Sequence, residues 1–459
     1  MKNNIKYMFL YLISLLLLLP SCSSIYSDAP PIEPITTIEV DPNEEYFTLG
    51  TAIDRNCNMG CWYNDSWIYD EYQEYQECIR TKPDGEKIYV GRKVRRFVKY
   101  NPYTNTVSSP CLDPICTHGP GSGCIFIVPN EALPDIKGMI GDWFLFGYAY
   151  ELSTELGFSS EVYAYNLSTG ELIQLSDFDP SAKVISQPKN WCTFGNKKYV
   201  TIQVLDYTDT DYIHKGERNE LDSYTPETKW YLWEMDFDTK KFTELFEVPE
   251  DYRITAVTNK RFYFIKETFG DEVFSSNHDG TDMRKEDVFN FSPQNFCGTY
   301  GYQFDDMIRI YDLRTNTATS VAKEYSYQRR VLTNEGILCS TFSTADENYQ
   351  KLRDSRTSYE VYSDYVSDVN KYRYEATSQI YLMGFNGQGK EIVYEGDGMI
   401  LDAYYKSGKY LYCIVGFPDP NNGYKCKSVV NDGRSVINIE TGEITPIPLL
   451  ELIIPEEYK

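Results

Sequence analysis

Short runs of alternating apolar and polar residues fill the chain from about Tyr46 to Pro448. Runs such as RRFVKY, EVYAY and WYLWEM have a period of two, which places every second side chain on one face of a strand. Stretches rich in Asn, Asp, Gly and Thr separate these runs and are typical of tight turns. The pattern therefore predicts an all-β body made of many short antiparallel strands.

One turn formula recurs between the runs. It consists of Asn or Asp, two residues, Thr, a turn-forming residue, one further residue and a final apolar or small residue. The five copies are NPYTNTV from Asn101, NLSTGEL from Asn166, DFDTKKF from Asp236, DLRTNTA from Asp312 and NIETGEI from Asn438. Asp279-Gly280 and Asn386-Gly387 add two variants, because such dipeptides tolerate the positive φ of hairpin turns. The sequence thus predicts seven hairpins.

A further pair of strand-like runs precedes most hairpins, for example MIGDWFLFGYAYE before Asn166. Four strands per unit, repeated along a chain, is the pattern of a β-propeller blade. We expect seven blades, with six or eight as alternatives. At about 58 residues per blade, against the usual 40–45, several loops must be enlarged, as in the stretches after Asp206 and Asp346. Stacked β-sandwich domains are the competing architecture, but they give no reason for one turn to recur.

These repeats resemble the TolB-like and WD40-like propellers of bacterial envelope proteins. The segment CLDPICTH, from Cys111, is similar to one in uncharacterised propeller lipoproteins of gut-type bacteria, a resemblance that implies kinship but no activity. A ring must join its ends. We therefore expect the segment from Glu45 to Ile53 to pair with the sheet of the last hairpin, because closure removes exposed strand edges.

The N-terminus has the pattern of an export signal. Two lysines lead an apolar run from Met8 to Leu19, too short for a confident membrane span. The following LPSC resembles the lipobox of bacterial lipoproteins, although Pro20 replaces the usual small residue; an ordinary signal peptide with a chance cysteine is the alternative. The resemblance implies that residues 1–21 are removed and that Cys22 carries lipid such as palmitate. The protein would then be anchored to the cell membrane or outer membrane, outside the cytoplasm.

Residues 22–44 are rich in Pro and acids, which predicts an extended tether before a propeller domain at 45–459. The chain has 68 acidic and 44 basic residues and a net charge of -24. Over most of the surface this charge repels nucleic acid and anionic lipid. We interpret it as solubility outside the cell and expect no nucleic-acid partner.

Twelve cysteines leave eleven once Cys22 is lipidated, an odd number in a compartment where disulfides persist. Three of them, with a histidine, lie in CLDPICTHGPGSGC: Cys111, Cys116, His118 and Cys124. Three thiolates and an imidazole can bind zinc tetrahedrally, but C-x4-C-x-H-x5-C matches none of the common zinc frameworks. We favour a disulfide-stapled loop at the foot of the first blade, with a metal site and free thiols as alternatives.

A second disulfide is predicted between Cys413 and Cys426, which flank a strand, a turn and a strand. Familiar catalytic motifs, such as H-E-x-x-H, G-x-S-x-G and the phosphate-binding glycine loop, do not occur in the sequence. A pair of carboxylates near the axis could serve glycoside cleavage, but nothing marks two among 68 acids. We predict no cofactor; zinc in the cysteine segment and calcium in DYTDTD are the alternatives.

Aromatic residues are abundant, at 15% of the chain. Most suit half-buried strands, and those on the enlarged loops could form a rim that binds a ligand. The rim candidates are Tyr207, Asp209, Asp211, Tyr212, Tyr359, Tyr362 and Tyr365. The sequence favours a membrane-anchored binding or scaffold module for a protein or glycan. A carbohydrate-active enzyme of the hydrolase or lyase type is the alternative, and an envelope protein whose shape alone matters is a third hypothesis.

Overall fold

The structure is a computed structural model in which strands predominate. A helical segment at residues 368–374 precedes one of the described strands. Within the described part of the chain, no helix is long and apolar enough to cross a membrane. The described residues are 41–50, 60–129, 132–151, 158–174, 183–185, 191–206, 227–266, 272–286, 295–304, 307–321, 329–333, 335–343, 351, 368–426 and 433–454.

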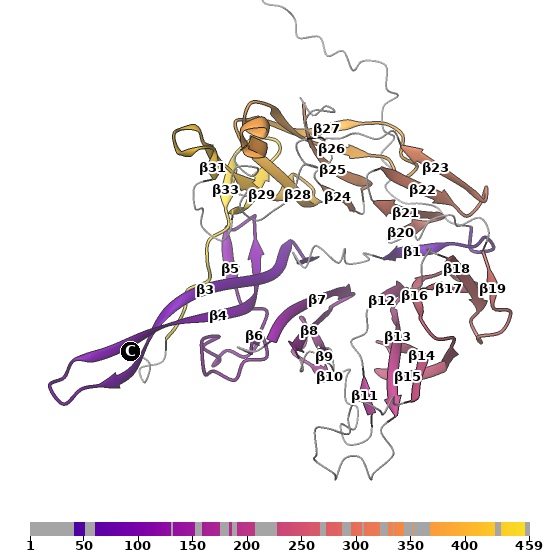
Figure 1. The fold of residues 1–459 in the computed structure, drawn as a ribbon, viewed down its shortest axis with the longest axis horizontal. Helices are drawn as coiled ribbons and strands as arrows, with labels where there is room; N and C mark the ends of the chain where they lie inside the picture. The colour runs from indigo at the N-terminus through magenta and orange to yellow at the C-terminus, as the bar shows by residue number, and fades with distance from the viewer. Residues whose placement is uncertain are drawn as a thin grey trace, which may run out of the picture.

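Seven antiparallel sheets follow one another along the chain and are arranged in a ring (Figure 1). Blade 1 contains β2 (Cys61–Tyr63), β3 (Ser66–Thr81), β4 (Lys87–Asn101), β5 (Thr106–Ser108) and β6 (Ile127–Val128). Blade 2 contains β7 (Ala132–Ile140), β8 (Trp143–Glu151), β9 (Phe158–Asn166) and β10 (Leu172–Gln174). Blade 3 contains β11 (Lys183–Ile185), β12 (Trp191–Phe194), β13 (Lys197–Asp206), β14 (Glu227–Asp236) and β15 (Lys241–Val248).

The remaining blades have the same order of strands. Blade 4 contains β16 (Tyr252–Val257), β17 (Arg261–Lys266), β18 (Glu272–Asn277) and β19 (Arg284–Lys285). Blade 5 contains β20 (Asn295–Gly298), β21 (Tyr300–Phe304), β22 (Ile308–Asp312) and β23 (Thr317–Val321). Blade 6 contains β24 (Arg329–Leu332), β25 (Ile337–Phe342), β26 (Thr377–Met383) and β27 (Glu391–Asp397). Blade 7 contains β28 (Ile400–Ser407), β29 (Tyr410–Gly416), β32 (Arg434–Asn438) and β33 (Ile444–Pro446), with a small hairpin of β30 (Pro418–Asp419) and β31 (Lys425–Cys426) around the 3-10 turn η2 (Pro420–Asn422).

The fold confirms the predicted seven-bladed propeller, and each predicted hairpin joins the third and fourth strands of one blade. The turn formula has a physical basis. In the second copy, Asn166 Oδ1 accepts hydrogen bonds from the backbone N–H groups of Ser168 and Thr169, both at 3.0 Å. The turn-forming residue Gly170 has a φ of 75°, in the left-handed region where glycine is favoured. The first residue therefore caps the turn and the fifth permits its reversal.

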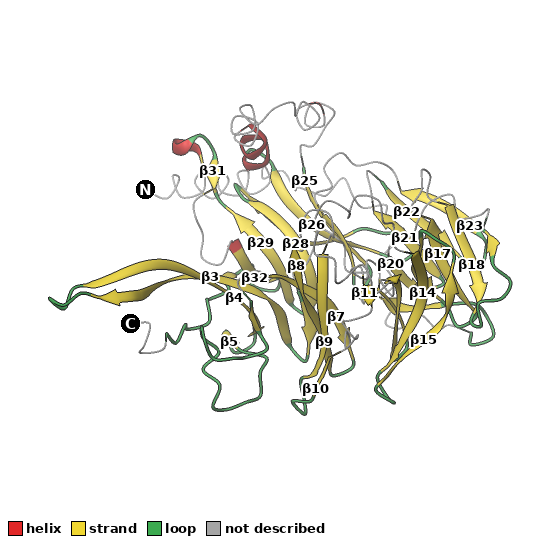
Figure 2. Ribbon diagram, turned by 60° about the horizontal axis from the view of Figure 1, so that its bottom comes forward, coloured by secondary structure: helices red, strands yellow, loops and turns green. Residues whose placement is uncertain are grey.

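Connections within an antiparallel blade alternate between two ends. The predicted hairpins lie at one end, so the connections between second and third strands lie at the other, which we call the loop face. Here β3 and β4 continue beyond the body as a two-stranded arm, residues 74–93 (Figure 2). The enlarged connections after Asp206 and Phe342 also leave from this face.

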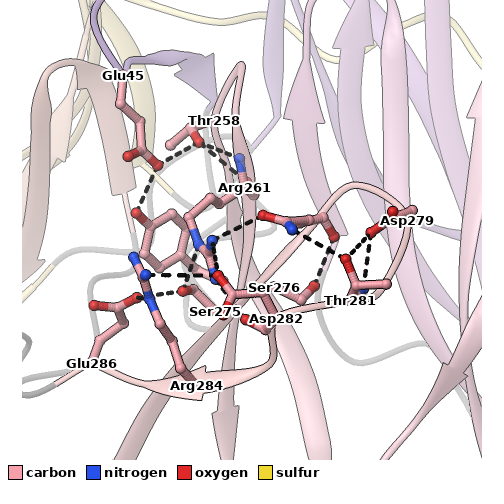
Figure 3. A network of polar contacts seen from close by, with 12 residues as sticks. Glu45, Thr258, Arg261, Ser275, Ser276, Asp279, Thr281, Asp282, Arg284 and Glu286 are labelled. Atoms are coloured by element: carbon pink, nitrogen blue, oxygen red, sulfur yellow. Dashed lines mark hydrogen bonds and ion pairs between the residues drawn. The ribbon is translucent and has the colours of Figure 1, made fainter.

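The predicted pairing of the N-terminal segment with the last blade is wrong. Strand β1 (Phe47–Gly50) pairs with β20, the first strand of blade 5, and Phe47 packs on Phe296 with ring centroids 4.6 Å apart. Glu45 fixes this position, since its carboxylate accepts hydrogen bonds from Thr258 and Tyr263, both at 2.7 Å (Figure 3). Alternation of apolar and polar residues predicts that a segment forms a strand, but it does not predict which sheet edge that strand pairs with.

Blades 7 and 1 close the ring through side chains and a terminal segment. Trp67 of blade 1 stacks on Tyr412 of blade 7, with ring centroids 5.2 Å apart. Residues 447–454, which we call the C-terminal strap, then run from β33 past β3 and β4 (Figure 1). The Leu450 N–H donates to Glu71 of β3 (2.8 Å), and Gln73 donates to the Leu450 carbonyl (2.7 Å). The strap thus joins the last blade to the first.

Candidate functional site

An insertion divides the outer strand of blade 1. Both β5 and β6 pair with β4, and residues 109–126 between them form a segment that we call the cysteine loop. Its backbone reverses repeatedly, with positive φ at His118 (52°), Gly121 (75°) and Gly123 (67°). Non-glycine residues adopt such angles rarely, so the conformation of His118 requires support from its surroundings.

The reversals bring four side chains together. One ligand atom each from Cys111, Cys116, His118 and Cys124 lies within 4.8 Å of all the others. The Cys124 Sγ is 3.6 Å from His118 Nδ1. The ten cysteines that the structure describes are unpaired, so the predicted disulfide in this loop is not supported. Four such side chains, so close together, can hold a soft cation.

Burial sets the protonation states in this cluster. It raises the pKa of the Cys111 thiol and of the Cys124 thiol. Burial also lowers the pKa of His118, and the positive charge of Arg96 lowers it further. The imidazole is therefore neutral near pH 7 and its Nδ1 can act as a ligand, whereas three neighbouring thiolates would require a compensating cation.

The cysteine loop contacts the C-terminal strap directly. A Cβ atom at Gly119 would lie 2.2 Å from the carbonyl oxygen of Ile453, so only glycine fits there. Arg96 of β4 joins the two segments, because its Nη1 donates to the carbonyls of His118 (3.2 Å) and Glu451 (3.4 Å). The guanidinium also pairs with the fully buried Glu71, with Nη2 3.0 Å from Oε1.

A second cluster lies at the loop face of blades 6, 7 and 1. The Arg329 guanidinium, at the start of β24, lies over the ring of Tyr404 in β28, 4.0 Å from its centroid. Burial raises the pKa of Tyr404 to about 12, against the opposing effect of Arg329. Arg373, in the helical segment before β26, has its Nη2 3.4 Å from Asp402.

The same cluster continues into blade 1. Arg434, at the start of β32, and Arg95 of β4 both lie beside Asp70, at 3.4 and 3.6 Å. Several donors in the cluster are buried without a hydrogen-bond acceptor: Nε and Nη1 of Arg329, Nε of Arg373 and Nε of Arg95. We call these four arginines, with Asp70, Asp402 and Tyr404, the arginine cluster.

The other predicted site residues have different outcomes. Cys22 and the predicted rim residues lie outside the described residues: Tyr207, Asp209, Asp211, Tyr212, Tyr359, Tyr362 and Tyr365. The predicted bridge from Cys413 is not supported, since its Sγ is buried and donates to the Ser435 carbonyl at 3.6 Å. Its expected partner, Cys426, instead accepts a hydrogen bond from Asn370 at 3.9 Å.

Sequence reasoning missed the arginine cluster. Its residues come from β3, β4, β24, β28, β32 and a helical segment, which are separated by up to several hundred positions. No short motif joins them. The one signal in the sequence was Arg329-Arg330 at the start of a strand in an acidic chain.

No protein-family model matches the sequence, and no curated protein matches it. Among solved structures, it is similar to a puromycin-hydrolyzing peptidase of Mycobacterium tuberculosis, at 10% identity and a TM-score of 0.41, covering 89% of this chain and 57% of that one. It is also similar to the β-propeller domain of the Trilobed protease from Pyrococcus furiosus (11%, TM-score 0.33, 70% and 86% covered) and to oligogalacturonate lyase from Vibrio parahaemolyticus (9%, 0.33, 85% and 89%). The chain spans little more than half of the first of these and of AtxE2 isopeptidase, of which it covers 54%. The fold by itself indicates no specific activity.

Proposed function

We propose that this protein is a membrane-tethered, extracytoplasmic propeller that binds an acidic glycan at its loop face. The observation that carries the proposal is the arginine cluster. Its four arginines and two aspartates leave a net charge of +2 (4 - 2), in a chain whose net charge is -24. A local patch of one sign focuses the electrostatic field and attracts ligands of the opposite charge.

The chemistry of the cluster fits carboxylate or sulfate groups. A guanidinium matches the planar, bidentate geometry of a carboxylate and remains charged at all relevant pH values. The buried donors of Arg329 and Arg373 would find acceptors in the oxygens of such a group, which removes the cost of leaving them without a hydrogen bond.

The position of the cluster also supports binding. The connections that carry the predicted aromatic rim leave from the loop face, after Asp206 and Phe342. The resemblance of the N-terminus to an export signal and a lipobox supports the location, in which the tether would hold the propeller away from a membrane. Metabolic labelling with a fatty-acid analogue tests this part: the full chain should be labelled, and Cys22→Ala should not.

Binding is tested by calorimetry with oligogalacturonate, using a neutral galactan oligomer of equal length as the comparison. We expect the acidic oligomer alone to bind, with an affinity that falls as salt is added. Arg329→Ala should weaken binding about 10- to 100-fold, since one charge-assisted hydrogen bond contributes about 1.5–3 kcal/mol. Arg314→Ala is the matched control, because this exposed arginine lies on the hairpin face of blade 5.

Equal binding of both oligomers, or of neither, would contradict the proposal. The same calorimetry is repeated with an acidic peptide. Binding of the peptide but of neither oligomer would indicate an acidic protein ligand in place of the glycan. The carbohydrate-active enzyme remains the second candidate because Asp70 and Asp402 lie within one cluster, each beside an arginine. New reducing ends from the acidic oligomer, lost in Asp402→Asn, would favour the enzyme.

A further inference from the structure

We propose that the cysteine loop binds one structural Zn²⁺ ion, which fastens the C-terminal strap and so closes the propeller. The ligands are the thiolates of Cys111, Cys116 and Cys124 and the Nδ1 atom of His118. This site is independent of the arginine cluster and of the ligand proposed there.

The geometry fits zinc. With Zn–S bonds of about 2.3 Å and Zn–N bonds of about 2.0–2.1 Å, a tetrahedron has S···N edges of about 3.5 Å and S···S edges of about 3.8 Å. The separation of Cys124 Sγ from His118 Nδ1 is 3.6 Å, and all four atoms lie within 4.8 Å. A disulfide would draw two sulfurs to about 2.05 Å and leave the third thiol and the imidazole without a role.

The composition of the site selects the metal and its role. Three soft thiolates and one imidazole favour zinc over the hard cations calcium and magnesium. Four protein ligands leave no open position, which is typical of structural rather than catalytic zinc. Binding requires only deprotonation: three thiol protons are released to solvent as three Zn–S bonds form, with no change of oxidation state.

The loop requires such support. Ile115 at its tip is 87% exposed, so burial of apolar side chains does not hold the tip in place. Within the loop the backbone hydrogen bonds are short in range, such as Cys116 N–H to the Asp113 carbonyl (3.3 Å) and Ser122 N–H to the Gly119 carbonyl (3.1 Å). Its ends are joined to the blades, where the Leu112 N–H donates to the Tyr165 hydroxyl (3.0 Å) and the Phe97 N–H to the Phe126 carbonyl (2.9 Å). A metal bonded at four positions would fix the left-handed conformation of His118, whose carbonyl accepts from Arg96.

The consequence for the ring follows from the contacts of the strap. Where Gly119 meets Ile453, the loop lies against the strap. Arg96 donates to carbonyls of both segments, namely His118 in the loop and both Leu450 and Glu451 in the strap. No described strand is shared between blades 7 and 1, so this contact, the ion pair of Arg434 with Asp70 and the packing of side chains hold the seam together.

The first test is metal content. The full chain, purified without added chelator, should carry one zinc per chain by elemental analysis, and Co²⁺ exchanged into it should give the intense visible absorption of a tetrahedral thiolate site. Cys124→Ser should lose both signals, and His118→Cys, which preserves four ligands, should retain them. Cys426→Ser is the matched control, because this exposed cysteine lies outside the cluster. A metal-free chain with two thiols fewer than expected would overturn the zinc site in favour of a disulfide.

The second test concerns the strap. Hydrogen exchange of the full chain should accelerate at least tenfold in residues 447–454 and in the cysteine loop when zinc is removed, while β16 to β19 of blade 4 stay unchanged. The exchange rates should return when zinc is restored. Zinc removal that leaves the strap unchanged would overturn its proposed role in closure.

Discussion

Replacing Arg96 tests the junction of blade 1, the cysteine loop and the strap. In Arg96→Met the apolar stem is kept but the guanidinium is lost, with its hydrogen bonds to Glu71 (3.0 and 3.1 Å) and to the carbonyls of His118, Leu450 and Glu451. Breaking one partner of a buried ion pair costs about 3–5 kcal/mol, because the other charge is left uncompensated. We expect the free energy of unfolding to fall by this amount at pH 7.

This cost should depend on pH through Glu71. Burial raises the pKa of this carboxyl group, against the opposing effects of the Leu450 N–H and of Arg96. Without Arg96 the pKa in the folded state rises further. A raised carboxyl pKa favours folding at low pH, and this contribution is lost as the pH rises through the folded-state pKa. The cost of Arg96→Met should therefore shrink as the pH falls, by about 1.4 kcal/mol per pH unit in the range where Glu71 is protonated in the variant alone.

Urea denaturation followed by tryptophan fluorescence measures this effect, since Trp67 is buried at the seam between blades 7 and 1. The measurement is made at pH 7 and pH 5.5 on the wild-type chain, Arg96→Met and the exposed control Arg314→Met. The double variant with Glu71→Leu should recover much of the loss, because both charges are then removed. A cost below about 1 kcal/mol at pH 7, or an equal cost at both pH values, would refute the reasoning.

Three further predictions concern the ring and its turns. Trp67→Ala should lower the free energy of unfolding by about 3–5 kcal/mol in the same denaturation assay, because its ring fills the seam; a loss under 1 kcal/mol would contradict seam packing. Gly336→Ala should cost more than Gly195→Ala by calorimetry, since a Cβ at Gly336 would lie 2.4 Å from the Met383 carbonyl oxygen whereas nothing lies within 4 Å at Gly195; equal costs would argue against that contact. Turn hydrogen bonds lower the pKa of Asp236, so its carboxylate stabilises the fold above the pKa of the unfolded state, and this stabilisation is lost as the pH falls through the pKa of the folded state. In Asp236→Asn, the free energy of unfolding should therefore fall less between neutral and acid pH than in the wild-type chain. An unchanged acid profile would be contrary to this.

The fold was predictable because its turns are local. Capping by Asn166 and the left-handed residue Gly170 act within five positions, so their spacing is visible in the sequence. The pairing of β1 was not predictable, because several inner strands offer an equivalent edge. It depends instead on Glu45 meeting Thr258 and Tyr263, more than 200 positions away.

The cysteine loop and the arginine cluster also differ in how far the sequence predicts them. The residues of the cysteine loop were visible as a group, but their spacing matched no common framework. Their convergence depends on backbone reversals at His118, Gly121 and Gly123. The arginine cluster depends on the order of blades around a ring, so only the folded chain brings Asp70 beside Arg434.

The central claim is that a four-ligand zinc site lies where the ring closes. X-ray absorption spectroscopy of the full chain at the zinc edge tests this claim most directly. The account predicts a first shell of three sulfurs at about 2.3 Å and one nitrogen at about 2.0–2.1 Å. A shell of oxygen and nitrogen alone, or a protein that takes up no zinc after full reduction, would contradict it.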